Sequence, residues 1–232
     1  MTISERLAIK YYGSIKLGGI NIWITQSDIN MWAIMAALII FAAVVRLKLK
    51  NFSDKPAGFQ NAVEALVEMF DNLLTGVMGR EYAYFSNWFF GLMAFILIAN
   101  ISGIIGLREP TADISMTLTF GLSSFALFHI MGVWKGRRHY FREYVTPSFI
   151  MLPIHIMGEL AKPISLSFRM FGAITGGYIL MELVYALFPA YLKIAIPAAL
   201  GGFFNIALGA LQAYIFLMLS LTFIRNNIPE EH

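Results

Sequence analysis

The sequence predicts an all-α polytopic membrane protein with about five transmembrane crossings, an interfacial amphipathic helix and a long tilted C-terminal helical hairpin. Of its 232 residues, 58% are hydrophobic and only 13% are charged, whereas a soluble domain carries about 25% charged residues. The apolar residues gather in runs of roughly 17 or more, which is the length that spans a bilayer as a helix. The basic residues collect beside these runs, a distribution typical of the loops of a membrane protein.

The composition also argues against several classes of function. The net charge of +3 reflects the loops beside the apolar runs, so we expect no nucleic-acid partner. The chain has no cysteine, which excludes disulfides, thiolate metal sites and cysteine nucleophiles. It also lacks H-E-x-x-H and G-x-S-x-G, two signatures of hydrolytic sites. We therefore expect no catalytic residues, metal or cofactor in this chain.

Five apolar runs define the predicted spans. They lie at about 29–45, 86–107, 114–134, within 148–188, and at about 195–224. Arg46, Lys48 and Lys50 follow the first run as a stop-transfer pattern rather than a cleavage site, so this run should remain as the first span. We expect 1–28 to be an extracytoplasmic segment and 29–232 to form a single membrane domain.

The lysines and arginines of the short loops predict the orientation, because they are enriched on the cytoplasmic side. Ten fall on one side: Arg46, Lys48, Lys50, Lys55, Arg80, Lys135, Arg137, Arg138, Arg142 and Arg225. Five fall on the other: Arg6, Lys10, Lys16, Arg108 and Lys193. This asymmetry predicts an N-terminus outside and a C-terminus in the cytoplasm.

An amphipathic helix is predicted at about 56–79, along the cytoplasmic interface. Its polar stripe consists of Gln60, Glu64, Glu68 and Asp71. Its apolar side consists of Val63, Leu66, Val67, Phe70 and Leu74. Ser53 or Asp54 can cap the helix, with Pro56 in its first turn.

The last two helices are unusually long. Ile164 to Phe188 and Ala198 to Ile224 contain no proline and would extend roughly 37 and 40 Å, against a hydrocarbon core of about 30 Å. Such lengths require tilt, bending or local thickening of the bilayer. Pro189 and Pro197 bracket the expected turn between the two helices.

A permanently charged residue, Arg169, lies in the fourth span, within "LAKPISLSFRMFGAITGGY" at 160–178. At bilayer depth an arginine costs about 2.5–3.5 kcal/mol, so it is tolerated where it faces a partner charge, water or a cavity. Snorkelling to the headgroups is the alternative interpretation. We favour a functional site, because an intramembrane charge usually marks one.

Small residues follow Arg169 closely. Gly172 and Gly176 have G-x-x-x-G spacing, extended by Ala173 and Gly177, and such a strip lets another helix approach. That helix belongs either to this chain or to a moving partner. An alternative function is a secondary transporter or channel that binds an anion at Arg169. However, no internal repeat is visible, and a channel with this arginine should repel cations unless a partner supplies negative charge.

Three motifs resemble one family. "GELAKPISLSFRMFG" at 158–172 resembles the signature of the a subunit of F-type ATP synthases. "EPTADISMTLTF" at 109–120 is similar to the start of that family's third span, and "LQAYIFLMLSLTFI" at 211–224 to its last helix.

The resemblance implies an integral subunit of a bacterial-type plasma or inner membrane. It would contact membrane lipid, a rotating c-subunit ring and the peripheral-stalk b subunits. Arg169 would face the carboxylates of the ring, between two aqueous half-channels. The arginine would force release of the translocated ion and block leakage. The small residues Gly172, Ala173, Gly176 and Gly177 would pack close to the rotor.

The sequence departs from the family pattern at the usual relay positions. Tyr178 stands where a glutamate is expected, Asn205 where a titratable residue is common, and Ala173 where an asparagine is usual. Glu182, one helical turn beyond Tyr178, is our candidate replacement. The coupling ion remains open: protons carried by Glu182 and water, or Na⁺ bound by oxygens.

The remaining candidates line the expected pathway. Ser165 and Gln212 supply polar groups that suit either ion. Glu159 lies roughly 15 Å before Arg169 along the helix and would line the cytoplasmic half-channel. Asp113 lies before the third span, where it would serve either the outer half-channel or as a helix N-cap.

Overall fold

The computed structural model describes residues 11–17, 20–48, 58–80, 86–145, 152–189 and 192–226. An antiparallel hairpin of β1 (Tyr11–Leu17) and β2 (Ile20–Thr25) leads directly into α2 (Gln26–Lys48). A capping box joins them, because the Asp28 carboxylate accepts hydrogen bonds from the Thr25 N–H and hydroxyl, both at 2.8 Å. No pattern in the sequence predicted this hairpin.

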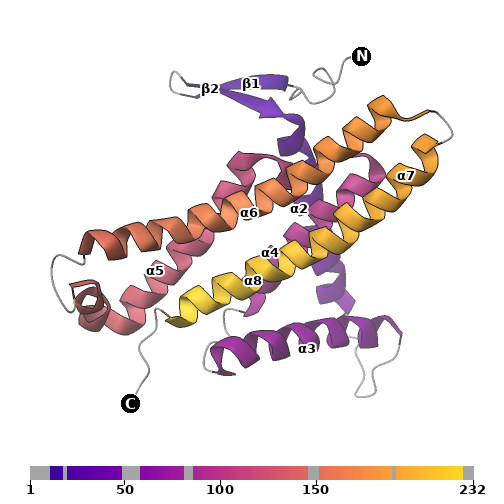
Figure 1. Ribbon diagram of the computed structural model, residues 1–232. Helices are drawn as coiled ribbons and strands as arrows, with labels where there is room; N and C mark the ends of the chain where they lie inside the picture. The colour runs from indigo at the N-terminus through magenta and orange to yellow at the C-terminus, as the bar shows by residue number, and fades with distance from the viewer. Residues whose placement is uncertain are drawn as a thin grey trace.

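The rest of the described chain is helical (Figure 1). The elements are α3 (Phe59–Met78), α4 (Ser86–Ile101), η3 (Ser102–Ile105), η4 (Pro110–Ala112), α5 (Ile114–Val145), α6 (Leu152–Leu187), α7 (Leu192–Gly201), the π-helix η6 (Gly202–Leu208) and α8 (Gly209–Asn226). Five stretches are long and apolar enough to cross a membrane: Gln26–Lys48, Ser86–Ile105, Ile114–Trp134, Leu152–Leu187 and Ile196–Asn226. The prediction of five spanning helices is confirmed.

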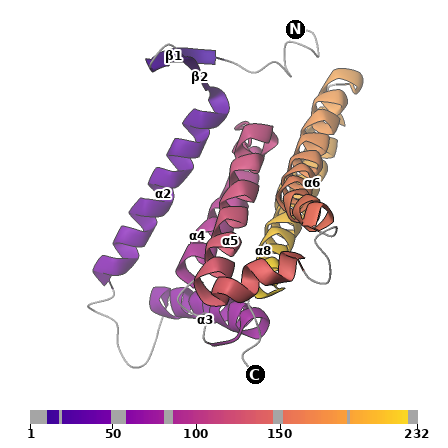
Figure 2. The ribbon, with the colours of Figure 1, turned by 90° about the vertical axis from the view of Figure 1, so that its left-hand side faces the viewer.

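Helix α3 lies across one end of the bundle, opposite the β-hairpin (Figure 2). We call these two ends the α3 end and the hairpin end. Phe70 and Leu74 of α3 are buried, whereas Leu66 and Val67 remain exposed. Arg225 near the end of α8 donates a hydrogen bond to the Val77 carbonyl at 2.7 Å, which ties α3 to the last span.

The predicted caps of α3, at Ser53 or Asp54 with Pro56, lie outside the described residues. Within them, Gly58 precedes the helix and makes no side-chain cap. That α3 lies along the membrane interface stays a prediction.

The C-terminal hairpin contains two prolines inside its helices, and it differs from the prediction at the second of them, Pro197. Pro163 lies inside α6, which is 36 residues long, and Pro197 lies inside α7 rather than at the edge of the turn. Membrane helices tolerate such prolines, because neighbouring groups and local adjustments satisfy the freed backbone atoms. Pro163 removes the backbone donor for the Glu159 carbonyl, one turn earlier. The Ser167 hydroxyl donates to the carbonyl of Pro163 itself at 2.7 Å. The π-helix η6 follows α7 and continues into α8.

The core lies where α4, α5, α6 and α8 meet. Phe89, Phe128, Leu217 and Leu221 belong to one buried cluster that also contains Phe70 and Leu74 of α3. A second cluster brings Leu166 and Met170 of α6 against Ala213 and Phe216 of α8.

Glycines permit the closest helix crossings. A Cβ on Gly121 of α5 would lie 2.8 Å from the Pro163 carbonyl, and one on Gly209 of α8 would lie 2.7 Å from the Asn100 Cβ. Both crossings therefore require a residue without a side chain.

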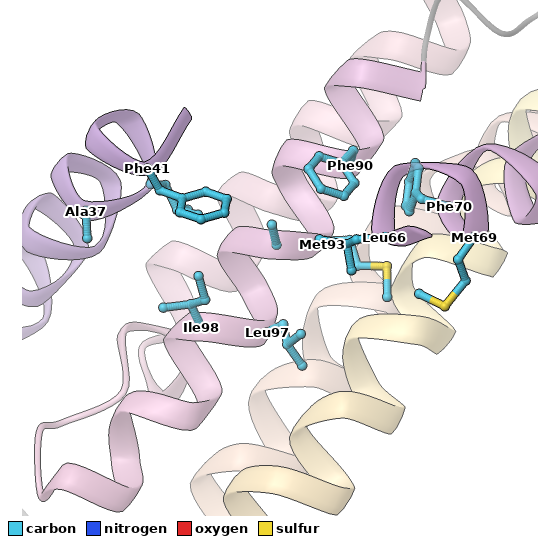
Figure 3. A pocket seen from close by; sticks show the side chains of 11 residues that line it. Ala37, Phe41, Leu66, Met69, Phe70, Phe90, Met93, Leu97 and Ile98 are labelled. Carbon is cyan, nitrogen blue, oxygen red and sulfur yellow. The ribbon is translucent and has the colours of Figure 1, made fainter. Parts of the chain in front are cut away.

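Helix α2 stands apart from the rest of the bundle (Figure 2). Between α2, α3 and α4 there is an open groove of about 380 Å³. Its walls are entirely apolar and include Phe41, Met69 and Phe90 (Figure 3). Many large apolar side chains along α2 and α6 are also exposed, as expected for surfaces that face hydrocarbon.

Candidate functional site

Arg169 lies on an exposed face of α6. Gly172 and Gly176 lie on the same face, three and seven residues further on, and a Cβ at either would meet nothing within 4 Å. Ser165, four residues before Arg169, is exposed on this face as well. We call this surface, formed by Ser165, Arg169, Gly172 and Gly176, the arginine face.

No ion pair of Arg169 exists among the residues that the structure describes. The arginine face therefore combines a permanent charge with a strip without bulky side chains, open to a neighbour.

Two of the small residues differ from the others. Ala173 is only half-buried, at the edge of the arginine face. Gly177 is buried, and a Cβ there would lie 2.9 Å from the Phe204 ring of η6. The close approach expected at Gly177 is thus made within this chain, so we leave Gly177 out of the surface offered to a partner.

Gln212 lies inside the bundle on α8, 4% exposed. Its neighbour in sequence, Ala213, packs in one cluster with Met170, the residue after Arg169. Its Nε2 atom has no hydrogen-bond partner in the described part of the chain. Gln212 is therefore a buried amide close to the level of Arg169 in the bundle.

A polar cluster at the hairpin end contains the predicted Tyr178 and Glu182 of α6. The guanidinium carbon of Arg108 lies 5.6 Å from the centroid of the Tyr178 ring. The carboxyls of Glu109 and Glu182 both act electrostatically on the Tyr178 hydroxyl. Nine residues make two and a half helical turns, so Tyr178 points away from the arginine face, toward the other helices.

Asn205 joins this cluster from the π-helix η6. A Cβ on Gly103 of η3 would lie 2.6 Å from the Asn205 Nδ2 atom and would also collide with the Glu109 carboxylate. The two polar groups are thus close neighbours. A π-helix adds a residue to the turn, and such segments are frequent at functional sites. Here it brings Phe204 onto Gly177 and Asn205 toward the loop before η4.

Glu109 was not among the site residues predicted from the sequence, although it is the first residue of the "EPTAD" motif. Its side chain is only 6% exposed. Burial raises the pKa of Glu109 from its ordinary value of 4.5 to about 8. The one signal in the sequence was a charged pair, Arg108 and Glu109, directly after an apolar run.

Asp113 caps α5. Its carboxylate accepts a hydrogen bond from the Ser115 N–H at 3.1 Å, and its carbonyl accepts from Met116 and Thr117. Next to it, the Thr111 hydroxyl donates to Asn100 Oδ1 at 2.6 Å, while Asn100 Nδ2 donates to the Gly209 carbonyl at 3.0 Å. These bonds hold the loop before α5 against α4 and α8.

A second polar cluster lies toward the α3 end of α6. Glu159 forms an ion pair with Lys162, one turn further along the helix. The Lys162 ammonium lies 5.4 Å from the Phe223 ring of α8, and both groups of the pair act electrostatically on His129 of α5. Glu159 thus lies between α5 and α6.

The order of polar groups along α6 defines a class of protein. Arg169 lies between the Glu159 cluster on one side and the Tyr178 and Glu182 cluster on the other, and no metal-binding group of acidic, histidine or cysteine side chains exists in the described ranges. Polar groups at two depths, with an exposed cation between them, characterise a membrane protein that moves ions.

The chain belongs to the ATP synthase A chain family, whose pattern matches residues 29–225. ATP synthase subunit a of Moorella thermoacetica is 34% identical over 212 residues, which cover 90% of this chain and 93% of that protein. Subunit a of Staphylococcus aureus is 30% identical, with 94% and 97% covered, and that of Trichlorobacter lovleyi is 27% identical, with 87% and 86% covered. Members of this family are the ion-translocating stator subunit of the Fo sector and are not catalytic themselves.

Proposed function

We propose that the arginine face of α6 lies against the rotating c-subunit ring and that Arg169 forces each passing carboxylate of the ring to release its ion. The observation that carries this proposal is an exposed arginine in a membrane span, beside two glycines with open space in front of them. Lipid is a poor neighbour for this charge, which would cost about 2.5–3.5 kcal/mol in hydrocarbon. A carboxylate-bearing helix is a favourable one.

The physical reason for ion release is electrostatic. A cation close to a carboxyl lowers the pKa of that carboxyl, so an ion-loaded site of the rotor unloads as it approaches Arg169. The guanidinium itself stays protonated at any working pH, so it blocks leakage along the interface without relaying protons. Each elementary charge moved across the membrane contributes about 2.3 kcal/mol per 100 mV.

The two polar clusters mark the two half-channels. Tyr178, Glu182 and Asn205 line the pathway at the hairpin end, and Glu159 lines the pathway at the α3 end. Ser165 and Gln212 supply polar atoms near the level of Arg169. Because Arg169 stands between the two clusters along one helix, ions reach the other side only by travelling on the rotor.

The orientation and the partners complete the proposal. The excess of lysine and arginine at the α3 end puts the hairpin end outside and the C-terminus in the cytoplasm. The membrane is then a bacterial-type plasma or inner membrane. The peripheral-stalk b subunits and lipid cover the apolar surfaces away from the rotor. The coupling ion is H⁺ or Na⁺, and Tyr178 and Asn205 offer oxygens that suit both.

The test uses the assembled ATP synthase in liposomes. We expect Arg169→Ala to abolish ATP synthesis driven by an ion gradient, while the subunit is still inserted and assembled. Arg46→Ala serves as the matched control, because Arg46 is exposed at the end of α2. Sustained coupled synthesis by Arg169→Ala would refute the proposal, and ATP-driven uptake measured with and without Na⁺ and an uncoupler identifies the ion.

A further inference from the structure

Glu109 is a buried carboxyl that has no role in the pathway described so far. It lies in the loop before η4, only 6% exposed. Within the described ranges, no ion pair or side-chain hydrogen bond holds its carboxylate. Burying a carboxyl without a partner is unfavourable, and acidic groups in such environments are concentrated at functional sites.

The space occupied by the Glu109 carboxyl is created by Gly103. A side chain on this residue of η3 would collide with the Glu109 carboxylate and with Asn205 Nδ2. Because Gly103 has none, a carboxyl from the loop and an amide from the π-helix meet between η3 and η6. This meeting point joins elements that are about a hundred residues apart in the chain.

The charged and titratable groups around Glu109 come from several elements. Arg108 precedes it in the loop, and its carbonyl accepts a hydrogen bond from Asn30 of α2 at 2.8 Å. Tyr178 and Glu182 approach from α6. The neighbouring acids are bound elsewhere: Asp28 of α2 to Thr25, and Asp113 at the start of α5 to Ser115.

We propose that Glu109 is a proton-carrying residue of the half-channel at the hairpin end, which hands protons on past Asn205 toward the rotor. The inference deepens the proposed function and rests on it. In one cycle, the Glu109 carboxylate takes a proton from a hydronium ion at the hairpin end, which is left as water, and becomes a neutral acid. It then gives this proton, through water, to an unloaded carboxylate of the c-ring and returns to the carboxylate form.

The chemistry of the neighbours favours Glu109 for this role. The Asn205 amide does not titrate, and the ordinary pKa of a tyrosine hydroxyl is about 10. A positioned acid transfers protons best when its pKa lies near the working pH. The raised pKa of Glu109, about 8, meets that condition. Glu182 acts on the same Tyr178 hydroxyl as Glu109 does.

The first experiment is Glu109→Gln in the purified, assembled complex, reconstituted in liposomes. ATP synthesis is driven by a fixed imposed potential while the pH is varied equally on both sides, so that the driving force stays constant. In the unchanged complex, synthesis should fall as that pH rises through about 8, because Glu109 loses its proton. In Glu109→Gln the rate should drop by about tenfold or more, since positioned proton carriers contribute roughly 10²–10⁴-fold. The fall near this pH should disappear.

Glu68→Gln, on the exposed polar stripe of α3, is the matched control and should leave rate and pH profile unchanged. Normal rates and an unchanged profile in Glu109→Gln would overturn the proposal. A lower rate with an unchanged pH profile would also overturn it, because it would assign Glu109 a packing role. Uncoupler-resistant Na⁺ uptake by the unchanged complex would also overturn the proposal, because the transported ion would then not be a proton.

A second variant tests the proposed role of Glu109 if the complex with Glu109→Gln does not assemble. Gly103→Ala keeps the acid but displaces its carboxyl, and the atoms nearest to the new methyl are the ends of two flexible side chains, Glu109 and Asn205. We expect slower synthesis and a shifted pH profile, whereas normal behaviour would refute the proposal. Gly91→Ala is the control, because a Cβ there meets nothing within 4 Å. Arg169→Ala is measured in parallel, so that coupled synthesis in that variant refutes the proposed function itself.

Discussion

The buried pair of Asn100 and Thr111 should be a main source of stability for the loop that carries Glu109. Both side chains are fully buried, and the pair makes two hydrogen bonds, at 2.6 Å within the pair and at 3.0 Å to the Gly209 carbonyl. Asn100→Leu conserves most of the volume, removes both bonds and leaves the Thr111 hydroxyl unpaired.

The size of the effect follows from these bonds. A typical internal hydrogen bond contributes about 1 kcal/mol, and an unpaired buried group costs about 1–3 kcal/mol. We therefore expect Asn100→Leu to lower the free energy of unfolding by about 2–4 kcal/mol, and Thr111→Val by about 1–3 kcal/mol. The double variant should be little worse than Asn100→Leu alone, with a coupling energy of about 1–2 kcal/mol.

The assay is reversible unfolding of the subunit in mixed micelles titrated with a denaturing detergent. Hydrogen exchange of the Ala112 and Asp113 amides, which bond to the Glu109 and Pro110 carbonyls, reports on the loop itself. Thr222→Val is the matched control, because its hydroxyl is exposed on α8 and bonds only to the Met218 carbonyl within the same helix. Strictly additive effects of Asn100→Leu and Thr111→Val would refute the reasoning.

Two further predictions concern α6. Gly177→Val should destabilise the isolated subunit by about 1–3 kcal/mol in the same unfolding assay, because its side chain overpacks against Phe204. Gly176→Val should not destabilise the subunit, because a Cβ at Gly176 meets nothing within 4 Å. Equal losses of unfolding free energy in the two variants would contradict this distinction. Glu182→Gln should slow ATP-driven ion pumping in liposomes if Glu182 lines the half-channel, and unaffected pumping would remove it from the pathway.

Hydropathy and local periodicity were sufficient to predict the spanning helices and α3. These features depend on neighbouring residues in the chain, because a helix satisfies its own backbone and an apolar run needs only length to cross a bilayer. Arg169 was also predictable, since a charge in an apolar span stands out without knowledge of its neighbours. The family resemblance supplied its expected role, which remains a proposal.

Pro163 and Pro197 show where local rules fail. Proline ends most helices in water because it removes a backbone donor and clashes with the preceding turn. Membrane helices tolerate such residues, and α6 and α7 continue through both prolines. The turn predicted between Pro189 and Pro197 was therefore wrong at Pro197, whereas α6 lies within the predicted range 148–188.

By itself, the sequence determined that this is a helical membrane protein with a charged residue in its fourth span, because hydropathy and charge are properties of each segment. Only the tertiary structure decided that Glu109 is buried beside Asn205, that Gly177 faces Phe204, and that Gly172 and Gly176 are left open. Those outcomes depend on how η3, η4, α6 and η6 pack together. Contacts between residues far apart in the chain set the burial of a side chain, and no local pattern encodes them.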